Sequence, residues 1–302
     1  MVDTPLVSIL INNYNYAQFL RAAIDSALAQ TYPNVEVIVV DDGSTDNSRE
    51  VIAGYGDRII PVLKENGGQA SAFNAGFAVS TGDIICFLDS DDIFLPQKVE
   101  EVVKVFDTYH DDIGWFFHRL ELVNVNTGMS IETNKMMPSD VCDFRHDSKR
   151  GKSFTPIPAT SGLCFTRTLL ENILPMPDAI QITSDNYLKQ VALALSKGFL
   201  TNKRLAIQYI HENNAYTLRN DKRFLKARIA VLTAYWIRSR FPQFEKLANN
   251  GFAFGIANYQ QSGGIETDYQ KLIQEYWSAT PLLAKLNIKL RIFYHRIKFF
   301  VT

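Results

Sequence analysis

The sequence predicts an α/β fold, in which a mostly parallel sheet is flanked by helices and followed by a helical C-terminal region. Over about the first 110 residues, short apolar runs alternate with stretches that carry apolar residues at helical spacing. Such alternation, with short turns between the elements, is typical of βαβ units on a parallel sheet. From about residue 221 onward the pattern is helical throughout. We therefore place a domain boundary between residues 218 and 219 of the 302-residue chain.

Turn-forming residues precede and follow each apolar run, and their positions predict where each element begins and ends. Val35–Val40 is rich in β-branched residues, which indicates a strand buried on both faces. Strand and helix alternate, beginning with a strand, at Leu6–Asn12, Tyr16–Gln30, Val35–Val40, Asn47–Ala53, Arg58–Leu63, Gly68–Ser80 and Asp83–Leu88.

The middle of the chain is less regular. Ile113–Val125 predicts a longer strand, which a turn at Asn126-Thr127-Gly128 folds into a hairpin. Asp143–Ser153 is polar and charged, so we expect an exposed loop there. The remaining expected elements are a strand at Ser161–Thr166 and helices at Ser184–Leu195, Lys222–Arg240, Phe244–Gln260, Asp268–Tyr276 and Pro281–Phe300.

Polar residues follow three of the predicted parallel strands. In such sheets ligands bind beyond the carboxyl ends of the strands. We therefore expect Asn12–Asn15, Asp41–Ser44 and Asp89–Asp92 to converge on one site.

The most informative of these segments is Asp89-Ser90-Asp91-Asp92, which ends a buried strand. Carboxylates packed this closely repel one another and are costly to desolvate. A divalent cation compensates them, and Mg²⁺ sites commonly use one or two protein carboxylates together with substrate phosphates. The segment therefore predicts a site for a metal-bound diphosphate, and the alternative is a solvated acidic turn.

The other two segments leave alternatives open. Asp41 and Asp42 either accept hydrogen bonds from a nucleobase or ribose, or simply form a strand-to-helix turn. Asn12-Asn13-Tyr14-Asn15 replaces the Gly-x-Gly-x-x-Gly turn of dinucleotide-binding folds, which argues against an NAD enzyme.

Composition limits the function classes. The 31 basic and 32 acidic residues nearly cancel, so no overall field favours nucleic acid. The three scattered cysteines lack metal spacing and fit a reducing compartment. No signal peptide pattern and no apolar run near the ~20 residues of a bilayer span is present, so we expect a cytoplasmic protein.

At this point the residues resemble glycosyltransferase family 2, whose members have the GT-A fold. The resemblance is strongest from Val7 to Pro96 and continues more loosely to about residue 220. Its pieces are Ser8–Asn15, Val39–Asp46, Asn66-Gly67-Gly68, Asn74-Ala75-Gly76, Phe87–Asp92, Ser161–Arg167, Ser184-Asp185-Asn186-Tyr187 and Tyr209–Asn214.

The resemblance implies a role for each matching residue. Asn12, Tyr14 and Asp42 would line the nucleobase pocket, most often for uracil, and Asp89 would contact the ribose or donor sugar. Asp91 would hold Mn²⁺ or Mg²⁺ on the diphosphate. The further residues expected at the donor are Asp41, Asn66, Gly68, Asn74 and Ser90.

Two implied roles depart from the family pattern or stay open. Asp185 would match the general base, although its usual neighbour Glu is replaced here by Ser184. His211 would be a metal ligand or a satisfied loop histidine. Likewise, Gly68 and Gly76 either let the backbone approach a ligand or let a small-residue helix pack on the sheet.

The family implies a metal-dependent, inverting transfer of one sugar from a nucleoside-diphosphate sugar, most often a UDP-sugar. The acceptor would be a hydroxyl of a saccharide or a lipid-linked molecule, in the assembly of surface polysaccharide or glycoconjugates. The Gln-x-x-Arg-Trp motif of processive synthases is absent, which favours single-sugar transfer. The alternatives are a sugar nucleotidyltransferase and a non-catalytic nucleotide- or sugar-binding domain.

The segment Lys285–Lys298 alternates basic and apolar residues. Such a helix either lies on an anionic membrane surface or docks on the protein with a solvated basic face. The sequence slightly favours the docked helix.

Overall fold

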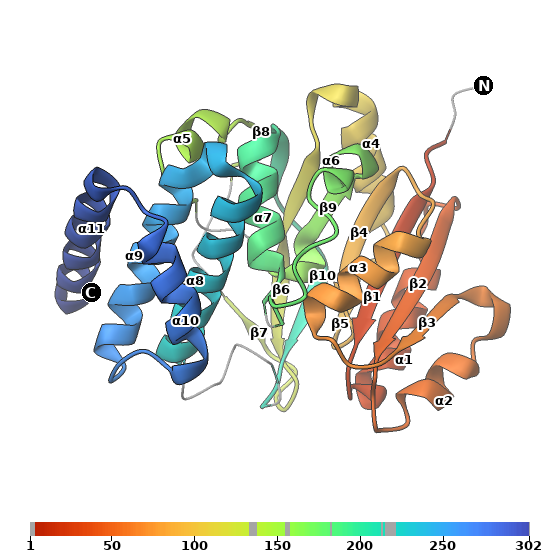
Figure 1. Cartoon of the computed structure of the whole chain (residues 1–302). Helices are drawn as coiled ribbons and strands as arrows, with labels where there is room; N and C mark the ends of the chain where they lie inside the picture. The colour runs from red at the N-terminus through yellow and green to blue at the C-terminus, as the bar shows by residue number, and fades with distance from the viewer. Residues whose placement is uncertain are drawn as a thin grey trace. The chain divides into compact units, whose positions relative to one another are not determined.

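The computed structural model describes residues 4–132, 138–154, 158–181, 183–212, 214 and 222–301 (Figure 1). The chain forms two compact units, which are described separately. The first comprises Met1–Asp143, Thr155–Asp185 and Leu195–Asn214, and the second comprises Phe144–Phe154, Asn186–Ala194 and Ala215–Thr302.

All the strands of the described residues belong to one sheet in the first unit, in the order β3-β2-β1-β4-β9-β6-β10-β5, with β7 beside β6 and β8 beside β10. The first four strands in this order are parallel, and β10 is parallel to β6. The strands are β1 Val7–Asn13, β2 Val35–Asp42, β3 Ile60–Lys64, β4 Ile84–Asp89, β5 Asp92–Phe94, β6 Trp115–Asn124, β7 Ser130–Ile131, β8 Asp140–Cys142, β9 Leu163–Thr166 and β10 Gly198–Ile210.

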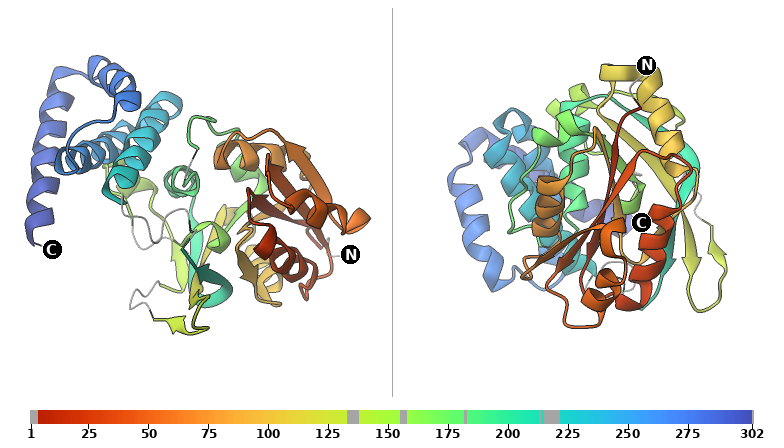
Figure 2. Two further views of the ribbon diagram at one scale, coloured as in Figure 1. Left: turned by 90° about the horizontal axis from the view of Figure 1, so that it is seen from below. Right: turned by 90° about the vertical axis from the view of Figure 1, so that its right-hand side faces the viewer.

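Helices cover both faces of this sheet, as the two views of Figure 2 show. The face formed by Val7, Ile9 and Ile11 of β1 packs into one core with apolar residues of α1 and α4. The helix α3 covers the opposite face. The helices of the first unit are α1 Ala17–Leu28, α2 Ser48–Ala53, α3 Gln69–Val79, α4 Lys98–Tyr109 and α6 Arg167–Glu171. Of α7 Asp185–Leu195, the two end residues belong to the first unit and Asn186–Ala194 to the second.

The glycine in α3 explains how this helix approaches the sheet. A Cβ atom at Gly76 would lie 3.0 Å from Val40 Cγ2 and 3.3 Å from Leu10 Cδ2. The sequence left two explanations for Gly76, and these short distances support close packing of the helix on the sheet.

The predicted α/β fold with flanking helices and a helical C-terminal region is confirmed. The sheet is mixed, because β9, β5, β7 and β8 pair with their neighbours in antiparallel orientation. The predicted loop at Asp143–Ser153 is wrong, because α5 (Arg145–Lys149) forms there and buries Ser148. The rings of Phe144 and Phe154, 4.1 Å apart, flank this helix. The helix α4 and the long strand β10 were not predicted.

The second unit is helical. Besides α5, it contains α8 Lys222–Arg240, α9 Glu245–Gln261, α10 Thr267–Ser278 and α11 Leu282–Val301. The helices α8 and α9 pack closely because Gly255 of α9 has no side chain: a Cβ there would lie 2.6 Å from Val231 Cγ2 and 3.1 Å from the Ala227 carbonyl. No helix in the described part of the chain is long and apolar enough to cross a bilayer.

We predict that Gly255→Ala destabilises the protein by about 1–3 kcal/mol, because the added methyl group overpacks the α8–α9 contact. Gly251 lies one turn earlier in the same helix, where a Cβ would meet nothing closer than 3.7 Å. Gly251→Ala is the matched control, and helix propensity should make it more stable by up to about 1 kcal/mol. Urea unfolding of the two variants measures both effects, and equal stability of the two would contradict the close contact.

Candidate functional site

The register of the parallel strands brings polar residues together at one edge of the sheet. Asn12 on β1 is the partner of Asp89 on β4, and Asn13 is the partner of Asp41 on β2. The side chains follow the same pairing. Asn12 Nδ2 donates to Asp89 Oδ1 at 3.0 Å, and Asn13 Nδ2 donates to Asp41 Oδ1 at 3.0 Å. Ser44 Oγ accepts from Asn13 Nδ2 and from the Asn15 backbone, so the predicted convergence of the three segments is confirmed.

Asp41 is buried, and it is held by groups of its own strand-to-helix turn. Its Oδ2 atom accepts from Arg49 Nε at 3.0 Å and from the Ser44 backbone at 3.2 Å. Its other oxygen is the one bonded by Asn13.

Asp42 anchors the loop that leads into α3. Lys64 lies 2.6 Å from its Oδ1, and the backbone amides of Gly67 and Gly68 donate to its two oxygens. Asn66 is exposed and donates to the Asp42 carbonyl. Gly68 has φ +84°, a left-handed conformation that favours glycine. The Asp42 carboxylate is therefore well compensated by this loop.

The acidic segment after β4 is compensated less fully. Ligand atoms of Asp89, Asp91 and Asp92 all lie within 4.8 Å of one another. Burial and the charge of Asp91 raise the pKa of Asp89 to about 7, and the charge of Asp185 acts in the same direction. Burial and the charges of Asp91 and Asp89 also raise the pKa of Asp92. The nearby Tyr16 hydroxyl has a raised pKa through burial and the same three carboxylates.

Ser161, in the turn Thr160–Gly162 before β9, holds this segment in place. Its hydroxyl donates to Asp92 Oδ2 at 2.6 Å and accepts from the Asp89 backbone amide at 3.1 Å. Its carbonyl accepts from Nζ of the fully buried Lys98 at 2.9 Å. Lys98 also lies 3.2 Å from the ring centre of Phe94. A serine from one element and a lysine from another thus support the acidic turn.

The end of β10 supplies a second support. His211 Nε2 lies 3.0 Å from Asp91 Oδ2, and Asn214 Nδ2 donates to the same oxygen at 3.1 Å. The His211 ring stacks on Phe19 of α1 with ring centres 4.6 Å apart. The His211 backbone amide donates to Asn214 Oδ1 at 2.7 Å. Asp91 therefore meets a fixed imidazole and a fixed amide.

Asp185 is the first residue of α7 and is mostly buried. Gln69, at the start of α3, links this helix start to the acidic segment. Gln69 Oε1 accepts from the Ser184 backbone amide at 2.8 Å, and Gln69 Nε2 lies 3.4 Å from Asp89 Oδ1. The structure thus brings Asp185 near Asp89, as the raised pKa of Asp89 also reflects.

The remaining predicted residues differ in their surroundings. Tyr14 is exposed, and Ser90 is buried beside the carboxylates. Asn74 lies within α3, where its amide bonds both the amide and the carbonyl of Met176 and also Asp178 Oδ1. The amide of Asn74 is thus engaged in holding the Met176–Asp178 segment, and its contact with a donor stays a prediction.

Sequence reasoning included Asp92 only as part of the acidic segment and gave no role to Lys98, Ser161, Gln69 or Asn214. Gln69 follows Gly67-Gly68 at a predicted helix start, which is a signal that could have identified it. Lys98 looks like any surface lysine in the sequence, because its burial depends on tertiary packing.

The carboxylates fit a divalent cation. Asp89, Asp91 and Asp92 each offer a carboxylate oxygen to such a cation, and both oxygens of Asp92 also accept hydrogen bonds, from Ser161 Oγ and the Tyr209 amide. A cation would relieve the repulsion that raises the pKa of Asp89. His211 reaches this group through Asp91. The distance of 3.0 Å between His211 Nε2 and Asp91 Oδ2 fits a hydrogen bond. It also fits two neighbouring ligand atoms of an octahedral ion, which lie roughly 3 Å apart when the metal–ligand bonds are ~2.1 Å.

The chain matches known proteins in sequence. A family model described as Glycosyl transferase family 2 matches residues 8–163. An uncharacterised glycosyltransferase of Nostoc sp. is 37% identical over 213 residues, which cover 69% of this chain and 66% of the relative. Glycosyltransferase GlyA of Streptococcus pneumoniae is 28% identical over 72% of this chain and 32% of the relative. The matched region thus spans less than two thirds of these relatives.

Solved structures share the fold. TarS of S. aureus (residues 1–349, in complex with UDP-GlcNAc) has a TM-score of 0.64 at 17% identity, over 97% of this chain and 88% of that chain. The mannosyltransferase PcManGT of Pyrobaculum calidifontis, in complex with GDP-Man and Mn²⁺, has a TM-score of 0.53 at 17% identity, over 98% and 87%. At this identity the likeness shows the fold alone.

We predict that Asp89→Asn stabilises the metal-free protein at pH 8. The pKa of Asp89 rises on folding from the ordinary 3.8 to about 7. The carboxyl therefore lowers the stability as the pH rises from about 4 to 7, and the full cost is present above pH 7. The amide removes this cost while keeping an acceptor for Asn12, so we expect a gain of about 1–3 kcal/mol at pH 8 and little change at pH 4. Thermal unfolding in EDTA at both pH values measures it, and a variant less stable than the wild type at pH 8 would refute the electrostatic account.

Proposed function

Because the chain belongs to glycosyl transferase family 2, we propose that it transfers one sugar from a nucleoside-diphosphate sugar to a hydroxyl group of an acceptor. The observation that carries the proposal is the juxtaposition of Asp89 and Asp91, as candidate ligands of a metal-bound diphosphate, with Asp185 close to Asp89. The proposal covers this chain, which matches only part of its relatives.

The donor is a UDP-sugar in this proposal. Asn12, Tyr14 and Asp42 line the nucleobase side, with Asp41, Asn66, Gly68 and Asn74 around them, and Asp89 and Ser90 face the ribose or sugar. In support, Asn12 Oδ1 is buried without a hydrogen-bond partner among the described residues, and a donor group of a bound ligand would satisfy such an acceptor. TarS in complex with UDP-GlcNAc shares the fold.

Asp91 would hold Mn²⁺ or Mg²⁺, with Asp89 beside it as a second candidate ligand, and His211 would be a further ligand or the partner that orients Asp91. When bound, the ion neutralises negative charge on the departing diphosphate. The protein contributes fixed positions for the carboxylates, through Ser161 on one side and His211 with Asn214 on the other.

Asp185 acts as the general base. It accepts the proton of the acceptor hydroxyl as the oxygen attacks C1 of the donor sugar, and displacement of the nucleoside diphosphate from the opposite side inverts the anomeric centre. General-base catalysis of this kind contributes about 10²–10⁴ in rate. No covalent nucleophile is needed, because the acceptor attacks directly.

The acceptor is a saccharide or a lipid-linked molecule, and one sugar is added at each encounter. We assign the reaction to the assembly of surface polysaccharide or glycoconjugates. The absence of a Gln-x-x-Arg-Trp motif supports single-sugar transfer.

The first test is calorimetric binding of UDP, GDP, dTDP and CMP with and without Mn²⁺. We expect UDP to bind in a Mn²⁺-dependent manner, and Asp91→Asn to weaken this binding at least tenfold because a metal ligand is lost. Asp57→Asn is the matched control, since Asp57 is exposed at the opposite end of β3. If none of the nucleotides bound, the proposed transferase activity would lose its basis.

The base assignment has its own test. Asp185→Asn should leave the affinity for the nucleotide within about threefold of wild type and lower transfer at least ~100-fold, because the amide cannot take the proton. Steady-state transfer and nucleotide binding are measured on the same preparation. Normal turnover in this variant would overturn the assignment.

A further inference from the structure

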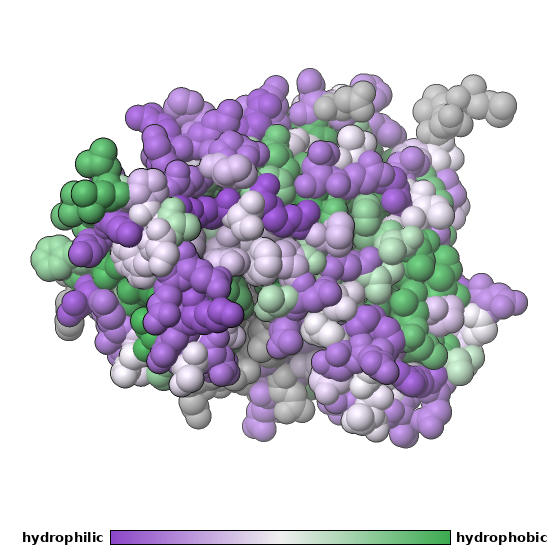
Figure 3. Space-filling model, viewed as in Figure 1, coloured by the Kyte–Doolittle hydropathy of each residue, from purple (hydrophilic) through white to green (hydrophobic). Residues whose placement is uncertain are grey.

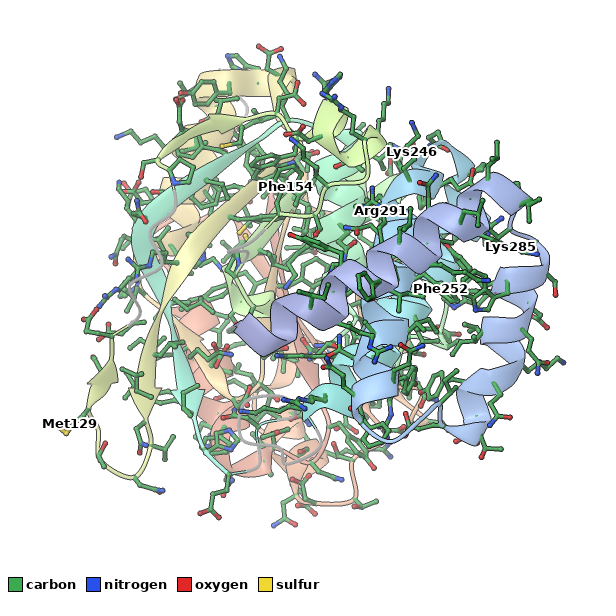
Figure 4. All side chains as sticks on the ribbon, turned by 90° about the vertical axis from the view of Figure 1, so that its left-hand side faces the viewer. Met129, Phe154, Lys246, Phe252, Lys285 and Arg291 are labelled. Atoms are coloured by element: carbon green, nitrogen blue, oxygen red, sulfur yellow. The ribbon has the colours of Figure 1, made fainter. Side chains whose placement is uncertain are left out.

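One face of α11 is docked on its own unit. Ile288 and Ile292 are buried, and Arg291 Nη1 donates to Asn250 Oδ1 of α9 at 2.7 Å. Figure 4 shows α11 in the foreground, seen from its outer side, with Lys285 and Arg291 labelled. These contacts fix which side chains of the helix remain outside.

The outer face is strongly apolar. Its seven large hydrophobic side chains are between 48% and 77% exposed: Leu282, Leu283, Leu286, Leu290, Phe293, Tyr294 and Ile297. The spacing of three or four residues places most of them in one stripe, about 24 Å long for the 16 residues from Leu282 to Ile297. Hydrophobic side chains project at the position of α11 in Figure 3. We call this surface the apolar stripe.

The charges around the stripe have one sign. From Leu282 to Val301 the chain contains Lys285, Lys289, Arg291, Arg296 and Lys298, and no aspartate or glutamate. Lys289 and Arg296 are exposed together with the apolar residues. A helix whose exposed face is apolar and whose own charges are all cationic is complementary to a surface that is apolar inside and anionic outside.

A second copy of the same helix fits this face poorly. If two such faces packed together, Lys289 and Arg296 of one copy would lie close to the same cations of the other copy and repel them. The helix α11 has no acidic residue that could pair with these cations. The sequence had slightly favoured a docked helix with a solvated basic face. The helix is docked, but its solvated face carries the apolar stripe as well as the cations.

We propose that α11 is a membrane-surface helix, which lies in the plane of an anionic lipid leaflet. The apolar stripe enters the boundary between head groups and acyl chains, and Lys289 and Arg296 contact lipid phosphates. This attachment is peripheral. It is independent of the proposed transfer reaction, so failure of either can be recognised without the other.

The test is co-sedimentation of the full chain with vesicles of phosphatidylcholine alone and with 30% phosphatidylglycerol. We expect binding to the anionic vesicles and at least tenfold weaker binding to the neutral ones. Leu286→Gln, Leu290→Gln and Phe293→Gln together should weaken anionic binding at least ~100-fold, because the inserted apolar area is lost. Lys289→Gln with Arg296→Gln should weaken it about 20-fold and reduce its salt dependence.

The matched control replaces three exposed apolar residues of the first unit, Leu63→Gln, Val79→Gln and Met129→Gln, and should bind within about twofold of wild type. Circular dichroism verifies that all variants fold. Absence of vesicle binding overturns the proposal. The proposal is also overturned if sedimentation equilibrium shows that the wild type is a dimer and the α11 triple variant is a monomer, because the stripe would then be an interface between copies.

Discussion

The repulsion among Asp89, Asp91 and Asp92 is the constraint on which the rest of the first unit depends. Three carboxylates at the end of a buried strand cannot be held together without support. That support comes from segments distant in sequence: Ser161 before β9, Lys98 on α4, and His211 with Asn214 after β10. The acidic turn therefore has this geometry only when the sheet is assembled on both sides of β4.

The pleat of the strands divides the site into two layers, because adjacent residues of a strand point to opposite faces. Asn13 and Asp41 bond each other on the face toward Arg49 of α2. Asn12 bonds Asp89, and Asp42 bonds the amides of Gly67 and Gly68 where α3 begins. A shift of one residue in the register would exchange these layers and separate every pair, so the ladder itself specifies the site.

Local patterns were sufficient to predict β1 to β4, the helices between them and the convergence, because β1, β2 and β4 end in polar residues after clear apolar runs. They were insufficient for β10, where Asn202-Lys203-Arg204 interrupts the apolar pattern and the register with β6 shifts between Thr201 and Arg204. They were also insufficient for Lys98 and Ser161, since only burial by other elements distinguishes these residues from surface ones. The donor and metal roles were suggested by motif resemblance, and the structure adds the partners that orient them.

The compensation of the acidic turn is incomplete in a specific way. Asp92, with hydrogen bonds to both oxygens, serves the scaffold, whereas Asp89 keeps a pKa near 7 despite the bonds from Asn12 and Thr160. Selection for stability alone would favour a neutral residue in place of such a carboxyl group. Functional sites, in contrast, commonly retain unfavourable groups that the rest of the structure offsets. In the proposed function, a cation bound between Asp89 and Asp91 would relieve this repulsion. Ser161 and Lys98 hold the carboxylates in the positions that such a cation would need.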